Sequence, residues 1–131
     1  MCLILLAIET RPEYKLVIAS NRDEFYDRPS APAHFWEDAP ELLAGRDLQA
    51  GGTWLGITRR GRLGMLTNYR DPISVKKNAP SRGGLLTHFL LGRQSPLEYL
   101  EEVRLEPEAY NGFNLIVGDQ NQLYWYSNRK G

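Results

Sequence analysis

Three pairs of apolar segments, each joined by four or five polar or turn-forming residues, constrain the fold more than any other feature of the sequence. The segments pair as 3–8 with 14–20, 53–58 with 63–67, and 113–118 with 123–127. Such pairs are typical of antiparallel β-hairpins. Because a sheet made of hairpins has an apolar face that another layer must cover, the pattern predicts a layered domain with antiparallel sheets.

Two helices are predicted between the second and third hairpins. Ser81 can cap a helix over 82–91, which carries an apolar face at helical spacing. Ser95 is followed by a first-turn proline and by Glu98, the arrangement of a capping box, so a second helix is expected to end near Leu105. The sequence therefore combines strands and helices in one chain.

Residues 27–40 contain three prolines and predict an ordered excursion over the surface. The sequence otherwise shows no repeat or low-complexity tract. With 131 residues, 42% of them hydrophobic and 24% charged, the chain has the size and composition of one globular domain. We therefore expect a single domain over residues 1–131.

Composition excludes several classes of function. Sixteen basic and sixteen acidic residues cancel, which removes the electrostatic argument for binding nucleic acid or an anionic membrane. The apolar run 2–8 is too short for a membrane span and lacks the basic start of a signal peptide. One cysteine excludes an internal disulfide and a multi-cysteine zinc site, and no other metal motif occurs. We expect a cytoplasmic protein with a small-molecule ligand or substrate; a homo-oligomer is left open.

The register of the first hairpin brings the single cysteine to a polar cluster. With a turn of about five residues, paired residue numbers sum to about 22–24, so Cys2 falls opposite residues 20–22. The polar cluster at this end of the hairpin has one amide and three charged side chains: Asn21, Arg22, Asp23 and Glu24.

Cys2 has two interpretations. Removal of Met1 would give Cys2 a free α-amine, which has an unperturbed pKa of roughly 8 and can act as the base for the thiol of the same residue. Asp23 can then hold the terminal ammonium, and Arg22 can anchor a carboxylate or steady the thiolate. The simpler interpretation is that Cys2 begins a buried strand as a small hydrophobe and that the charged run is a solvated turn.

The other two hairpins also end in polar corners that contain asparagine. Pairing returns Asn68 towards residues 51–53 and Asn128 towards residues 112–114. Asparagine is common at strand ends because it favours turns. The corners are therefore consistent with a site and equally with ordinary turns.

Six motifs in order resemble the NRDE family, also described as Transport and Golgi organization 2-like. They are MCLI at the start, SNRDEFYDRP at 20–29, LAGRD at 43–47, GGTWLGI at 51–57, LTNYRDP at 66–72 and GFNLIVGD at 112–119. The resemblance covers nearly the whole chain. It implies an α+β fold, the N-terminal-nucleophile (Ntn) hydrolase-like αββα sandwich of antiparallel sheets. Because members of the family are usually much longer, the chain resembles the N-terminal portion of their domain.

Within that superfamily the chain is similar to cysteine amidases that hydrolyse penicillin V and bile-salt amides. The resemblance implies that Cys2 is the nucleophile, that Arg22 and Asp23 lie beside the terminal amine, and that Asn68 and Asn128 serve the oxyanion site or substrate pocket. A later arginine of those amidases has no counterpart in this chain. The expected substrate-binding residues are Asn21, Glu24, Thr67 and Asn114.

Two functions follow from these expectations. The first is a cysteine amidohydrolase that uses Cys2 to cleave a C–N amide bond of a small N-acyl substrate, without a cofactor. The second is a non-catalytic Ntn-fold carrier or chaperone for haem or another hydrophobic small molecule, as the eukaryotic relatives of the family suggest. In that case Cys2 can supply a thiolate ligand to haem iron, and His34 or His88 an imidazole.

Overall fold

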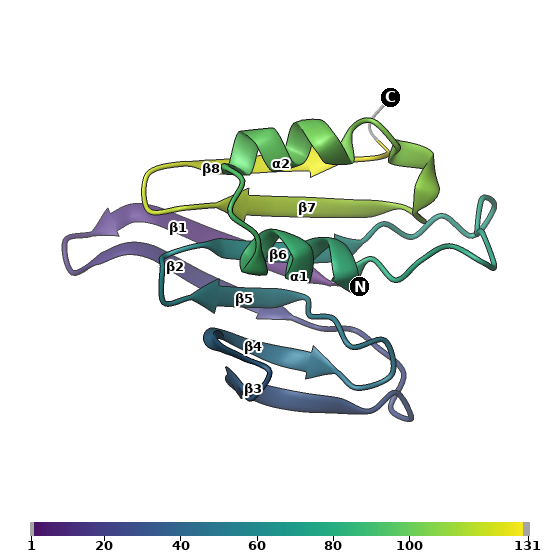
Figure 1. Cartoon of the computed structure of the whole chain (residues 1–131), viewed down its shortest axis with the longest axis horizontal. Coiled ribbons are helices and arrows are strands. Elements are labelled where there is room, and N and C mark those ends of the chain that lie inside the picture. The colour runs from purple at the N-terminus through teal and green to yellow at the C-terminus, as the bar shows by residue number, and fades with distance from the viewer. Residues whose placement is uncertain (1, 130–131) are drawn as a thin grey trace.

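The computed structural model describes residues 2–129, whose strands form two antiparallel sheets (Figure 1). The smaller sheet contains β1 (Leu3–Arg11) and β2 (Tyr14–Asn21). The larger sheet contains, in spatial order, β3 (Ser30–Trp36), β4 (Ala39–Asp47), β5 (Leu55–Thr58), β6 (Leu63–Asn68), β7 (Phe113–Gly118) and β8 (Leu123–Ser127). Each neighbour in the larger sheet is also the next strand along the chain, so the sheet is an antiparallel meander.

The helices and the two sheets are stacked in layers. Between β6 and β7 the chain forms α1 (Gly83–Leu91), α2 (Pro96–Val103) and a short 3₁₀ helix, η1 (Pro107–Ala109). In Figure 1 the two α-helices lie in front of the larger sheet, and the β1–β2 hairpin lies behind it. The predicted α+β layered architecture is confirmed. Within residues 2–129, neither helix has the length and apolar character needed to cross a bilayer.

The hydrophobic core lies between α1, α2 and the larger sheet. The side chains that the sequence placed on one face of α1 are all buried there: Leu85, Leu86, Phe89 and Leu90. Glycines below α1 make room for them. A Cβ atom at Gly64 would come within 2.2 Å of Leu86 Cδ1, and one at Gly56 within 2.8 Å of Leu90 Cδ1. The helix can therefore lie close to β5 and β6 only because these two positions lack a side chain.

The helix ends confirm one predicted cap and correct the other. Ser95 Oγ accepts a hydrogen bond from the Glu98 backbone N–H (3.3 Å), and the Glu98 carboxylate accepts one from the Ser95 N–H (2.8 Å), which completes the predicted capping box. The prediction that Ser81 caps α1 was wrong. The helix begins at Gly83 with Arg82 at the N-cap and no side-chain cap bond, so Ser81 lies one position too early.

The prediction of a surface excursion over residues 27–40 was also wrong, because most of that segment belongs to the β3–β4 hairpin. Pro32 is tolerated because β3 is an edge strand and its pairing is irregular between Ala31 and His34. Trp36 anchors the hairpin: its side chain is buried and its indole N–H donates to the Ala44 carbonyl at 3.1 Å.

The first hairpin has the predicted register. Leu3 pairs with Asn21 and Ile8 with Leu16, so paired residue numbers sum to 24. The interpretation of this segment as a buried strand was wrong, because Leu3 and Ile8 are 55% and 57% exposed. β1 and β2 pack mainly against each other, so most side chains of the hairpin stay exposed to water.

Candidate functional site

Cys2 lies at the end of the hairpin where β2 stops, beside the predicted charged run. Its Sγ atom is 3.4 Å from the backbone N–H of Asp23, which donates to it, and 4.0 Å from the Asp23 carbonyl oxygen. The cysteine is free and half-buried. The expectation that the register places Cys2 next to residues 21–24 is confirmed.

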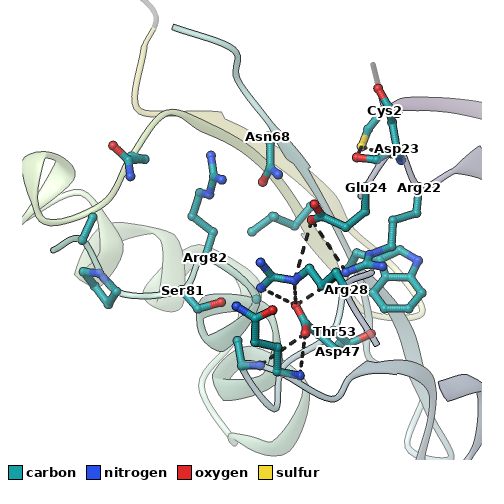
Figure 2. Close-up of a pocket in the computed structure, with 18 of the residues that line it drawn as sticks. Cys2, Arg22, Asp23, Glu24, Arg28, Asp47, Thr53, Asn68, Ser81 and Arg82 are labelled. Carbon is teal, nitrogen blue, oxygen red and sulfur yellow. Dashed lines mark hydrogen bonds and ion pairs between the residues drawn. The ribbon is translucent and has the colours of Figure 1, made fainter. Parts of the chain in front are cut away.

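A pocket with two lobes opens at Cys2. Figure 2 shows residues that line the smaller lobe. The smaller lobe has a volume of about 460 Å³ and the larger about 1040 Å³. We call the two together the Cys2 pocket. Residues that line both lobes include Cys2, Asp23, Glu24, Arg28, Asn68 and Arg82. Four of these, Cys2, Asp23, Glu24 and Asn68, were predicted from the sequence as site residues, so ends of the first two predicted hairpins do converge on one cavity.

Arg22 ties the hairpin to the larger sheet. Its guanidinium lies over the Trp54 ring, 4.3 Å from the centroid, and Nη2 is 3.5 Å from Asp47 Oδ2 and 3.8 Å from Glu24 Oε2. Trp54 precedes β5 and Asp47 ends β4, so these contacts fix the end of β2 against two segments of the other sheet. The geometry gives Arg22 a positioning role; its predicted contact with the thiolate stays a prediction.

Arg28 and Asp47, which line the smaller lobe together with Cys2, form an ion pair that sequence reasoning missed. Nε and Nη2 of Arg28 both donate to Asp47 Oδ2, at 2.9 and 2.7 Å. Asp47 Oδ1 accepts from the backbone N–H groups of Gln49 and Ala50. Burial alone would raise the pKa of Asp47, but these hydrogen bonds outweigh it and lower the pKa. Hydrogen bonding to Asp47 in turn raises the pKa of Arg28. The available signal was that both residues lie in the family motifs.

We predict that Asp47 makes stability depend on pH. Because its pKa is lower in the folded state than in the unfolded state, the unfolded chain binds more protons as the pH falls below about 5. The stabilisation is therefore complete above the unfolded pKa and is lost as the pH falls through the folded one. Asp47→Asn should reduce the free energy of unfolding at pH 7 by about 1–3 kcal/mol and flatten its acid-side slope, as measured by denaturant unfolding across pH.

The matched control for this prediction is Asp38→Asn. Asp38 also pairs with an arginine, Arg46, but its side chain is 60% exposed, so a smaller loss is expected. An acid-side slope in Asp47→Asn equal to that of the unmodified chain would contradict the prediction.

The predicted substrate-binding residues divide between the pocket and the hairpin end. Thr67 and Asn114 pair across β6 and β7, and the Asn114 amide donates to Thr67 Oγ1 at 3.2 Å in the larger lobe. Glu24 lines both lobes. Asn21 instead accepts a hydrogen bond from the Leu3 N–H at 2.8 Å, which closes the end of the hairpin, and it is not among the lining residues.

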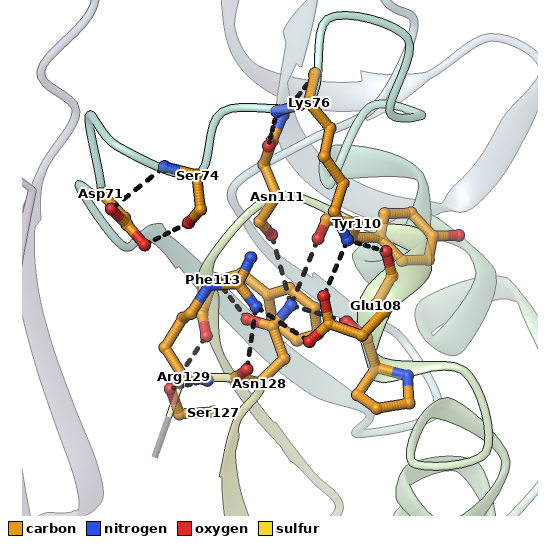
Figure 3. A network of polar contacts seen from close by, with 11 residues as sticks. Asp71, Ser74, Lys76, Glu108, Tyr110, Asn111, Phe113, Ser127, Asn128 and Arg129 are labelled. Atoms are coloured by element: carbon orange, nitrogen blue, oxygen red, sulfur yellow. Dashed lines mark hydrogen bonds and ion pairs between the residues drawn. The ribbon is translucent and has the colours of Figure 1, made fainter. Parts of the chain in front are cut away.

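Asn128 does not join the Cys2 pocket. Its Oδ1 accepts from the Phe113 N–H at 2.8 Å, and its Nδ2 donates to the Pro107 carbonyl at 2.9 Å. Figure 3 shows it inside a polar network that joins the end of β8 to the start of β7 and to η1. Donation to an oxyanion would require the amide to leave these backbone partners. The role predicted for Asn128 thus has no support from this geometry.

Arg82 is a third pocket residue that sequence reasoning missed. It precedes the first turn of α1, and that turn lies very close to the segment before β5: a Cβ atom at Gly52 would come 2.6 Å from the carbonyl carbon of Gly83. This close approach of two backbones brings Arg82 to the pocket, where Nη1 donates to the Gly112 carbonyl at 2.7 Å. The sequence offered only the run Arg82 to Gly84, which has no phosphate-loop spacing.

The two histidines lie away from Cys2. His34 is on β3, with Nδ1 2.7 Å from the Pro32 carbonyl oxygen, and His88 is on α1, with its ring 5.9 Å from that of Tyr99. Neither lines a lobe of the Cys2 pocket. Across residues 2–129, no three or more His, Cys, Asp or Glu side chains gather in a way that could hold a metal ion.

The motifs that build this pocket are those of a known family. The family model described as "Transport and Golgi organisation 2" matches residues 1–131. The chain belongs to this family. The resemblance to the NRDE family is thereby confirmed.

Curated members of the Transport and Golgi organisation 2 family show the same relationship. The Mus musculus "Transport and Golgi organization 2 homolog" is 45% identical over 141 residues, which cover 98% of this chain and 51% of the relative. The Homo sapiens homolog has the same identity and coverage. The Drosophila melanogaster "Transport and Golgi organization protein 2" is 32% identical over 140 residues, covering 93% of this chain and 48% of the relative. The chain spans about half the length of these relatives.

Proposed function

We propose that the chain carries the catalytic nucleophile of an Ntn-type cysteine amidohydrolase that cleaves a C–N amide bond of a small N-acyl substrate. One observation carries the proposal. Cys2 lines both lobes of the pocket, its sulfur lies next to the Asp23 backbone, and Asn68 lines the same two lobes. A nucleophile in this position can meet a substrate whose acyl and amine parts occupy the two lobes.

The reaction needs water and no other co-reactant. After hydrolytic removal of Met1, the α-amine of Cys2 takes the thiol proton, and the sulfur attacks the amide carbonyl carbon. A C–S bond forms and the carbonyl oxygen becomes an oxyanion. The C–N bond then breaks, the leaving amine receives the proton from the α-ammonium, and a thioester remains. Water attacks the thioester with the α-amine as base, which releases the carboxylic acid and restores the thiol.

The surrounding residues have separate parts in this proposal. Asn68 donates its amide N–H to the oxyanion, and Asp23 holds the terminal ammonium. Arg22 positions the hairpin through Trp54 and Asp47. Removing one oxyanion donor costs about 10²–10³ in rate in other acyl-transfer enzymes, which sets the effect expected at Asn68.

We predict that turnover requires a free amine on Cys2. Two preparations differ by one residue: a chain that begins at Cys2, and the same chain with one glycine added before Cys2, each verified by intact mass. The first chain should release amine from a panel of N-acyl substrates at least about 10²-fold faster, because only there is the α-amine on Cys2 itself and a positioned base contributes about 10²–10⁴ in rate. Equal turnover by the two chains would refute the terminal-amine mechanism.

A carrier for haem or another hydrophobic small molecule is the second candidate. The larger lobe favours it, because Phe25, Tyr69 and Val75 line that lobe with exposed apolar side chains. The carrier would show a saturable shift of the haem Soret band that Cys2→Ala removes, with no amine release from any amide of the panel.

A further inference from the structure

The Cys2 pocket contains a half-buried cation that differs from its neighbours. Arg22 and Arg28 both form ion pairs with Asp47 and Glu24. In contrast, no carboxylate among residues 2–129 forms an ion pair with Arg82. The other unpaired cations of the pocket, Lys77 and Arg70, are exposed to water, which screens their charge.

The environment of Arg82 is suited to an anion. Burial lowers the pKa of its guanidinium, and the carboxylate of Glu24 opposes that shift. Glu24 itself is engaged by Arg22, Arg28 and the Phe25 N–H. A guanidinium has five N–H donors, and the Gly112 carbonyl accepts from Nη1. Donors therefore remain to bind a planar anion in the fork geometry that carboxylates match.

We propose that Arg82 binds a carboxylate of the amide substrate, so that the site takes N-acyl amino acids. This inference rests on the proposed amidohydrolase function and names its substrate class. Arg82 and Cys2 line both lobes, and Figure 2 shows them on opposite sides of the cavity with Asn68 between them in that view. In an N-acyl amino acid one carbon separates the scissile nitrogen from the carboxylate. The acyl chain lies in the larger lobe, against Phe25, Tyr69 and Val75.

The test compares two substrates that differ only in the carboxylate: an N-acylglycine and the N-acyl-methylamine with the same acyl chain. The expected kcat/KM is about 10- to 100-fold higher for the N-acylglycine, because charge-assisted hydrogen bonds contribute about that factor. Arg82→Gln should remove that preference by lowering kcat/KM for the N-acylglycine alone, and Arg82→Lys should retain part of it. The control is Arg60→Gln, which removes an exposed guanidinium paired with Glu41 outside the pocket and should keep the full preference.

Binding to Cys2→Ala separates this inference from the proposed function. In that variant, N-acylglycine should bind more tightly than N-acyl-methylamine by calorimetry, and adding Arg82→Gln should abolish the difference. Hydrolysis of both amides with equal kcat/KM by the unmodified chain would overturn the inference and leave the function standing. Carboxylate-dependent binding without hydrolysis would support the role of Arg82 and overturn the amidohydrolase. Equal binding of the two ligands would overturn the role of Arg82 even if Arg82→Gln failed to fold.

Discussion

Cys2→Ala is expected to reduce amide turnover by about 10⁴-fold or more while changing the free energy of unfolding by no more than about 0.5 kcal/mol. The first effect follows because no thioester can form without the sulfur. The second follows because Cys2 is half-buried and its described hydrogen bonds are the weak ones of a sulfur atom to the Asp23 backbone. Amine release and denaturant unfolding measure the two quantities.

Two further variants sharpen that experiment. Cys2→Ser keeps a nucleophilic atom at the same position and should leave a low residual turnover above that of alanine. Ser20→Ala alters a nearby exposed side chain at the end of β2, outside the pocket, and should keep full turnover. Turnover by Cys2→Ala at the rate of the unmodified chain would remove Cys2 from the mechanism.

Leu90→Ala is expected to lower the free energy of unfolding by about 3–5 kcal/mol, the largest effect on stability that we predict. Leu90 is 0% exposed, and its Cδ1 atom fills the space above Gly56. The glycine cannot occupy the volume that alanine would vacate, so a cavity should remain between α1 and β5. Denaturant unfolding monitored by circular dichroism gives the difference.

The next residue along the helix provides a matched control. Leu91→Ala removes the same atoms from a side chain that is 40% exposed, and it should cost less than about 1 kcal/mol. If Leu90→Ala leaves no folded chain, that result agrees with the prediction as long as Leu91→Ala folds. Equal losses at the two positions would show that the core is not packed between α1 and the larger sheet.

The hairpins were predictable where apolar segments flank a short turn. The register of β1 and β2 followed from turn length alone, since Leu3 must face the end of β2 when Ile8 faces Leu16. The β3–β4 hairpin was not predictable in this way. Prolines usually interrupt strands, and the sequence does not reveal that Pro32 lies on an edge strand, where the missing N–H costs no pairing.

Part of the candidate site was likewise predictable from local sequence, and part was not. Local register was enough to place Cys2 beside Asp23. Arg28, Asp47 and Arg82 were missed because their neighbours are distant in sequence, and their convergence depends on strand order and on the approach of α1 to the segment before β5. Asn128 shows the opposite case: a strand-end position that matched the expected pattern has its side chain hydrogen-bonded to backbone groups of its own corner, so its oxyanion role stays a prediction.

Cys2, the proposed nucleophile, lies at the end of the smaller sheet, whereas Asn68 belongs to the larger sheet, and Arg22 links the two sheets. A shift of the hairpin relative to the larger sheet would displace Cys2 from Asn68 on β6 and from Arg82 at the start of α1. A misplacement of about 1 Å can cost about 10² in rate. A small slide of the hairpin would therefore silence the chemistry while the core between α1 and the sheet stayed intact. Under the proposed mechanism, the catalytic rate would report how the hairpin is aligned with the larger sheet, whereas the melting temperature would report only how the core is packed.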